Sequence, residues 1–121
     1  MLFRSMKNDG IGNFALSPLP VMAQTAPVFT FIAADFDSDG KIDIFTGGNF
    51  WDIKPDIGRL DANAASFYKG DGSGSFNYIS PVISGLKIKG QVRDALTVKF
   101  KNNNLLLLAR NNDAVIFLQT K

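Results

Sequence analysis

The apolar residues of this chain come in short runs that clusters of Gly, Asn, Asp and Pro interrupt. The runs at 28–32 and 41–45 are rich in β-branched and aromatic residues. Runs of this length and composition, bounded by turn residues, are typical of β-strands. We therefore expect an all-β fold of antiparallel strands, with further strands at 92–100, 105–109 and 114–118. The four leucines at 105–108 also suit a helix by propensity, but the Asn-rich turns around them favour a buried central strand.

Two turn clusters share one pattern. The motif Asp-Gly-x-Gly-x-Phe occurs at 9–14 and again, 62 residues later, at 71–76. Each copy lies between apolar runs and therefore predicts a β-hairpin. Self-similarity at such an offset predicts repeated units, which for strands are propeller blades or solenoid turns. A unit of 62 residues is long for a blade of roughly 40 to 50, so we interpret the aperiodic segment at 48–62 as an insertion.

Composition excludes several kinds of chemistry. The chain has no cysteine and no histidine, which removes disulfides, Cys/His zinc sites, thiol nucleophiles and Ser-His-Asp catalysis. Its net charge of +2 is too small to predict binding to nucleic acid or to an anionic membrane. No run approaches the roughly 18 apolar residues of a membrane-spanning helix, and the first ten residues lack the apolar region of a secretory signal. We expect neither a nucleic-acid partner nor a membrane span.

The strongest chemical signal is an acidic loop between two predicted strands. Carboxylates at alternate positions of a loop converge on one hard cation, and Gly40 permits the sharp turn that this requires. Calcium fits best, because magnesium prefers a rigid octahedron with retained waters and zinc prefers nitrogen or sulfur ligands. The predicted ligands, completed by water, are the carboxylates of Asp35, Asp37, Asp39 and Asp43 and the backbone carbonyl of Lys41.

The same acidic pattern has two other interpretations, an EF-hand loop and a metal-free turn. The same letters begin an EF-hand loop, but the twelfth position is Thr46 instead of a bidentate Glu, and the flanking runs predict strands instead of helices. The loop is also compatible with a metal-free turn, since turns rich in Asp and Gly are common in β-proteins. Four acidic residues at this spacing favour the metal.

The loop at 35–43 between strands, followed by the hairpin at 70–76, resembles the FG-GAP/VCBS repeat family of β-propeller blades. The stretch from about 31 to 117 further resembles the carboxy-terminal end of large FG-GAP/VCBS proteins of Bacteroidetes-type bacteria. This resemblance implies a calcium-stabilised, extracytoplasmic module that is not an enzyme and that serves as a structural scaffold or in protein interaction and adhesion. The implied Ca²⁺ ligands are those given above.

A closed propeller needs roughly four to eight blades, so the chain resembles a fragment of one. The expected divisions are a last hairpin of one blade at 1–20, a full blade at 28–80 with the calcium loop 35–43 and the insertion 48–62, and a three-stranded terminal blade at 86–121. An incomplete propeller exposes strand edges and apolar faces. The expected partners are therefore the missing blades of a longer chain or further copies of this one, besides an unknown protein or glycan ligand.

The insertion carries the second set of candidate residues. Phe50, Trp51 and Arg59 lie on a long loop, where binding surfaces concentrate, and predict a ligand-binding site for a carbohydrate or a protein. The alternative is that the two aromatic residues anchor the insertion while Arg59 pairs with Asp56 or Asp61.

Two weaker hypotheses complete the list. A glycosidase-like reaction would need two carboxylates some 5 to 10 Å apart. The candidates for it are Asp52, Asp56 and Asp61, with Trp51 as a platform for sugar, but we expect no catalytic residue. A loose basic stretch is interpreted as a solvated sheet surface and comprises Lys87, Lys89, Arg93, Lys99 and Lys101.

Overall fold

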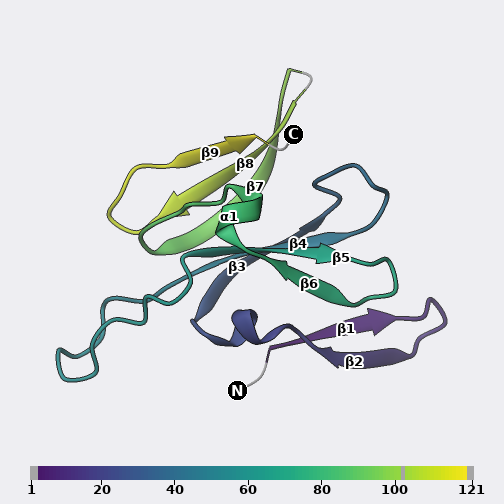
Figure 1. The fold of residues 1–121 in the computed structure, drawn as a ribbon, viewed down its shortest axis with the longest axis horizontal. Coiled ribbons are helices and arrows are strands. Elements are labelled where there is room, and N and C mark those ends of the chain that lie inside the picture. The colour runs from purple at the N-terminus through teal and green to yellow at the C-terminus, as the bar shows by residue number, and fades with distance from the viewer. Residues whose placement is uncertain (1–2, 102, 120–121) are drawn as a thin grey trace.

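A computed structural model describes residues 3–101 and 103–119 and confirms the all-β fold. Three antiparallel sheets follow one another along the chain and are stacked in that order (Figure 1). Strands β1 (Arg4–Asn8) and β2 (Phe14–Pro18) form the first, and β7 (Val92–Phe100), β8 (Asn103–Arg110) and β9 (Ile116–Gln119) form the third. The four-stranded middle sheet contains β3 (Val28–Ala34), β4 (Asp43–Gly48), β5 (Ala65–Gly70) and β6 (Phe76–Ile79).

Short helical segments connect the sheets. The 3₁₀ helix η1 (Val21–Gln24) joins the first sheet to the middle one, and the single-turn helix α1 (Pro81–Ser84) precedes the third. Within each sheet the strands pair in sequence order, so each sheet is an up-and-down meander, and none of the three closes into a barrel. Within residues 3–101 and 103–119, no helix has the length and apolar character needed to cross a membrane.

Strand β4 lies at the centre of the molecule, and all six of its residues are buried. Alternate side chains of a strand point to opposite faces, and here they enter two different cores. Ile44 packs with Tyr68 and Ala23 on the face toward η1, whereas Phe45 packs with leucines of β8 on the face toward the third sheet. The run 105–108 is the central strand of that sheet, but only Leu106 and Leu108 are buried.

The end of β4 is held between other parts of the backbone. A Cβ added to Gly48 would lie 1.9 Å from the carbonyl oxygen of Pro27, and one added to Gly47 would lie 2.5 Å from Cγ1 of Val92. No side chain fits at either position, because real Cβ atoms do not approach other atoms so closely. The close packing of β3, β4 and β7 depends on these two glycines.

The two predicted hairpins have the same structure. Met6 lies opposite Leu16 in the first, and 62 residues later Tyr68 lies opposite Tyr78 in the second. The loop of each is closed by an N–H···O bond of 3.1 Å, from Asp9 to the carbonyl of Asn13 and from Asp71 to that of Ser75. The motif therefore defines both the register and the turn.

Candidate metal centre

The loop from Asp35 to Ile42 connects β3 to β4, so the flanking strands expected for it are confirmed and the flanking helices of an EF-hand are absent in this described segment. Ser38 and Gly40 both have positive φ, 61° and 81°, and reverse the chain. Side chains then bond to the backbone: Asp35 accepts the N–H groups of Asp39 and Gly40 at 3.1 and 2.9 Å. Asp and Gly suit such a turn because one supplies the acceptor and the other the left-handed backbone.

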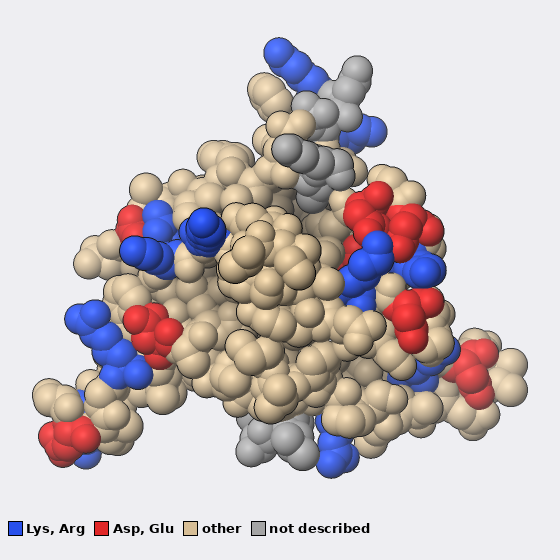
Figure 2. Space-filling model, viewed as in Figure 1, with Lys and Arg blue, Asp and Glu red and all other residues tan. Residues whose placement is uncertain are grey.

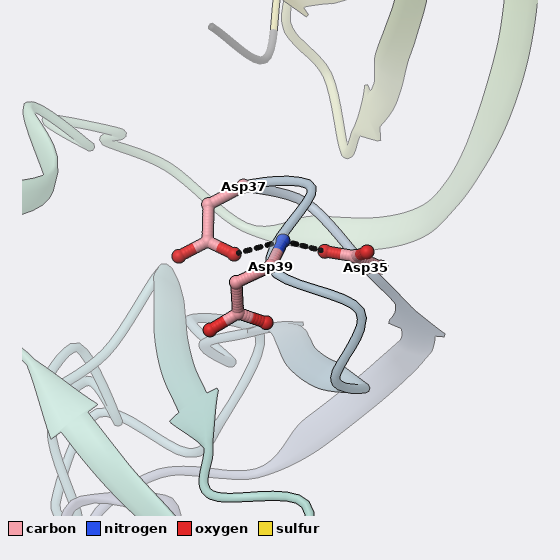
Figure 3. A group of neighbouring side chains, drawn as sticks. All are labelled: Asp35, Asp37 and Asp39. Atoms are coloured by element: carbon pink, nitrogen blue, oxygen red, sulfur yellow. Dashed lines mark hydrogen bonds between the residues drawn. The ribbon is translucent and has the colours of Figure 1, made fainter.

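Three of the predicted ligands lie together. One carboxylate oxygen from each of Asp35, Asp37 and Asp39 lies within 4.8 Å of the other two, and all three residues are exposed. In Figure 3 the Asp39 amide stands between the carboxylates of Asp35 and Asp37, to which it donates hydrogen bonds of 3.1 and 3.3 Å. The loop therefore turns around its own acidic side chains.

A lysine from the neighbouring strand reaches this acidic group. Lys69 of β5 forms ion pairs with Asp37 and, at 3.1 Å, with Asp39. The space-filling view shows acidic and basic atoms side by side on the flank formed by the β3–β4 loop and the tips of the hairpins (Figure 2). Three carboxylates lie near the ammonium groups of Lys69 and Lys41, so negative charge remains in excess at the loop.

The protonation equilibria reflect these contacts. The pKa of Asp39 lies below its ordinary value because the Lys41 amide, and after it the Lys69 ammonium, stabilise the charged carboxylate. The pKa of Lys69 is raised because hydrogen bonds to Asp37 and Asp39 favour its protonated form. Both effects keep Asp39 ionised and Lys69 protonated at neutral pH, and a carboxylate must be ionised to bind a metal ion.

Asp43 has a different environment from the other predicted ligands. It is fully buried, and its two carboxylate oxygens accept the N–H groups of Phe36 at 3.2 Å and Gly70 at 2.9 Å. The residue thereby ties the start of the loop to the end of β5. Lys41 donates its N–H to Asp39 at 2.9 Å. A metal bond from the Lys41 carbonyl or from Asp43 stays a prediction.

The insertion is anchored on the third sheet. Phe50 and Leu60 form an isolated antiparallel bridge that closes the insertion, and the backbone N–H of Trp51 donates to the side chain of Gln91 at 2.8 Å. The Arg93 guanidinium lies 4.3 Å from the centre of the Phe29 ring and 5.4 Å from that of Phe50. Phe50 is therefore anchored through its ring, and Trp51 is held through its backbone.

The pairing expected for Arg59 is wrong. Among residues 3–101 and 103–119 no ion pair joins Arg59 to Asp56 or Asp61, and its guanidinium lies 4.9 Å from the centre of the Trp51 ring instead. Cation and ring attract each other in this arrangement. Trp51 and Arg59 line an open groove of about 660 Å³ together with Asp61, whereas Phe50 packs against Phe29 at a ring separation of 6.0 Å.

Asp52 and Asp61 of the insertion are engaged in polar contacts. Asp52 lies 3.6 Å from Arg93 and accepts a hydrogen bond of 3.3 Å from Asn111. Asp61 accepts one of 2.7 Å from Asn49. These contacts give both carboxylates a role in holding the insertion.

Sequence reasoning missed Asn49 and Lys69. Asn49 is 1% exposed with φ of 75°, and its amide contacts Asp61, Gly90 and Asn63. A local signal existed, since an Asn after two glycines at the end of a strand is typical of a left-handed position. Lys69 had no such signal, because 32 residues separate it from Asp37.

Comparison with known proteins gives no assignment: no family model, curated protein or solved structure matches the chain. The functional argument therefore rests on the loop geometry. Three adjacent carboxylates on an exposed turn can replace part of the hydration shell of a divalent cation.

Proposed function

We propose that the loop from Asp35 to Asp43 binds one calcium ion and that the protein is a calcium-stabilised, non-catalytic structural or interaction module. The single observation that carries the proposal is the convergence of Asp35, Asp37 and Asp39. Carboxylates held together this closely repel one another, and a divalent cation relieves that repulsion. Asp43 and the Lys41 carbonyl complete the proposed ligand set, with water.

Calcium suits this loop better than magnesium. All three clustered aspartates are exposed, and their positions follow from a turn and not from a rigid cage. Calcium accepts six to eight oxygen ligands in a flexible arrangement, whereas magnesium needs a near-ideal octahedron. Exposed sites with few protein ligands bind calcium with a Kd of about 10⁻⁴ to 10⁻³ M, and the calcium concentration outside the cell is high enough to occupy them.

The ion would act as a brace. The loop begins at the end of β3, and Asp43 joins it to Gly70 of β5 through a buried hydrogen bond. Lys69, the residue before Gly70, contacts Asp37 and Asp39. A cation bound by the loop would therefore stabilise the β3–β4 connection at the point where it contacts β5.

The resemblance of this loop and of the 70–76 hairpin to FG-GAP/VCBS repeats supports the broader proposal. In that interpretation the three sheets are successive propeller-type blades, the protein is extracytoplasmic, and its role is structural, in protein interaction or in adhesion. The stacked order of the sheets is compatible with this arrangement.

Thermal unfolding followed by circular dichroism tests the calcium proposal. The transition is measured with excess chelator, with calcium and with magnesium. At a calcium concentration ten times the Kd, mass action stabilises the fold by about 1.4 kcal/mol, which raises the Tm by several degrees. A Tm that calcium leaves unchanged would contradict the proposal and would show that the loop is a metal-free turn.

Saccharide binding at the insertion is a second candidate function, favoured by the open groove of about 660 Å³ that Trp51, Arg59 and Asp61 line. Sugars usually bind to surfaces that combine aromatic rings with paired polar groups. Arg59 lies over the Trp51 ring, so a sugar that stacks there must displace it. Binding to a glycan array that persists in chelator and disappears in Trp51→Ala would support this function. A wild-type chain that binds no glycan on the array would exclude saccharide binding.

A further inference from the structure

The third sheet has one apolar face that the described chain leaves uncovered. Ala95, Leu106 and Leu108 point into the core shared with the middle sheet. Because side chains alternate along a strand, the intervening residues point to the opposite face. There Leu96 lies opposite Leu107, and Leu107 lies opposite Phe117. Leu96 and Phe117 are 46% and 63% exposed.

The other end of the stack has a matching surface. Met6, Phe14 and Leu16 share one face of the β1–β2 hairpin, because Met6 pairs with Leu16 and Phe14 is two residues away from Leu16. They are 63%, 56% and 58% exposed. Lys7 points to the opposite face and bonds to the Ser73 carbonyl of the β5–β6 hairpin. The apolar face is therefore turned away from the middle sheet.

The chain itself shows how the corresponding face of the second hairpin is covered. Met6, Phe14 and Leu16 correspond, 62 residues on, to Tyr68, Phe76 and Tyr78, because the two hairpins have the same register. In the middle sheet these three side chains pack into a core with residues of the preceding connection, and Tyr68 is fully buried. The equivalent face of β1–β2 is thus of the kind that the chain buries on the side of the preceding element.

We infer that this preceding sheet is the β7–β9 sheet of a second copy of the chain, packed head to tail. The uncovered face of the third sheet is the side on which a following sheet would continue the stack (Figure 1). The uncovered face of β1–β2 is the side on which a preceding sheet would pack. Joining the two repeats the sheet-on-sheet packing that the chain uses between its middle and third sheets.

Charge does not oppose this association. The net charge is only +2, so copies repel one another weakly. The two surfaces differ from each other, so the interface is heterologous, and it forms a closed ring or an open array instead of stopping at a dimer. The inference gives the interaction role proposed above a defined partner and does not depend on calcium.

Analytical ultracentrifugation of the full chain over a wide micromolar range tests the inference, in chelator and in calcium. The wild-type chain is expected to form species larger than dimers as concentration rises. Leu16→Lys disables one face and Phe117→Lys the other, so each variant alone is expected to be monomeric. Val82→Lys is the matched control, because Val82 is 88% exposed on α1 and lies on neither face, and it should associate like the wild type.

Mixing the two variants is the decisive arm. The Leu16→Lys chain keeps its β7–β9 face and the Phe117→Lys chain keeps its β1–β2 face, so an equimolar mixture is expected to form heterodimers and nothing larger. Met6→Lys and Leu96→Lys are the substitutes if either variant loses its circular dichroism spectrum. A monomeric wild-type chain would overturn the inference. So would dimers of either variant alone, which would show like faces pairing, or a mixture that stays monomeric.

Discussion

The ammonium group of Lys69 lies 3.1 Å from a carboxylate oxygen of Asp39. The lysine belongs to β5 and the aspartate to the turn between β3 and β4, so this pair joins a strand and a turn that are distant in sequence. Lys69 contacts Asp37 as well. In the calcium account the same carboxylates bind the ion, and a bound ion must therefore displace the ammonium or share its ligands.

Lys69→Gln is expected to raise calcium affinity, by roughly three- to tenfold, because the substitution removes a positive charge that competes for Asp37 and Asp39. Titration calorimetry measures the change. Lys54→Gln removes the same charge from the exposed insertion and should leave affinity unchanged. Equal affinities in the two variants would show that the ion does not bind at these aspartates.

Gly70→Ala is expected to destabilise the fold by about 2 kcal/mol or more. A Cβ at this position would lie 2.0 Å from the carbonyl oxygen of Ile42, so the backbone next to Asp43 must move. Denaturant unfolding gives the free energy. Gly10→Ala provides the comparison: nothing lies within 4 Å of its Cβ, and only its φ of +85° opposes the change, at about 1 kcal/mol. Equal losses in the free energy of unfolding for the two variants would contradict the close approach of Gly70 to the Ile42 carbonyl.

Asn49→Gly is expected to cost about 2 to 4 kcal/mol, because it leaves the N–H of Asn63 and the carbonyl of Gly90 without the buried amide. Glycine tolerates the positive φ of this position, so the variant isolates the loss of the side chain. Faster proteolysis within 50–60 should accompany the change. Asn77→Ala, at an exposed position of β6, should stay within about 0.5 kcal/mol of the wild type. An equally small effect at Asn49 would contradict its anchoring role.

Acid is expected to weaken both hairpin turns. Backbone N–H groups of Ile11 and Asn13 and the Asn13 amide lower the pKa of Asp9, and the hydroxyl and N–H of Ser73 lower that of Asp71. A carboxyl group whose pKa is lower in the folded chain stabilises the fold above its unfolded pKa of about 3.9. That contribution is lost as pH falls through the folded value.

The measurement is Tm against pH below about 5. Asp71→Asn should lower Tm at neutral pH and should show a smaller fall in acid than the wild-type chain, because one titrating group is gone. Identical acid profiles for the two chains would contradict the role of Asp71.

Patterns within a few residues predicted the all-β class and most of the strands. The Asp-Gly-x-Gly-x-Phe motif located both hairpins, and the turn residues on either side of 92–100 located β7. The sequence could not reveal which strand faces are covered, because alternation places Leu106 and Leu107 on opposite faces without saying which face is buried.

Only part of the candidate site could be predicted, because local patterns do not show which distant segments lie side by side. Asp35, Asp37 and Asp39 converge because one tight turn contains them, which local spacing reveals. Asp43 already belongs to β4, and its burial depends on β5 passing close enough for the Gly70 N–H to reach it. Contacts of this kind join residues that are far apart in sequence, and a spacing pattern carries no information about them.

Calcium titration by isothermal calorimetry tests the central claim most directly, with wild-type chain, Asp37→Asn and Asp56→Asn. The account predicts one calcium ion per wild-type chain, its loss in Asp37→Asn, and its retention in Asp56→Asn, which removes the same charge from the exposed insertion. Absence of calcium binding to the wild-type chain, or equal binding to all three chains, would contradict the account.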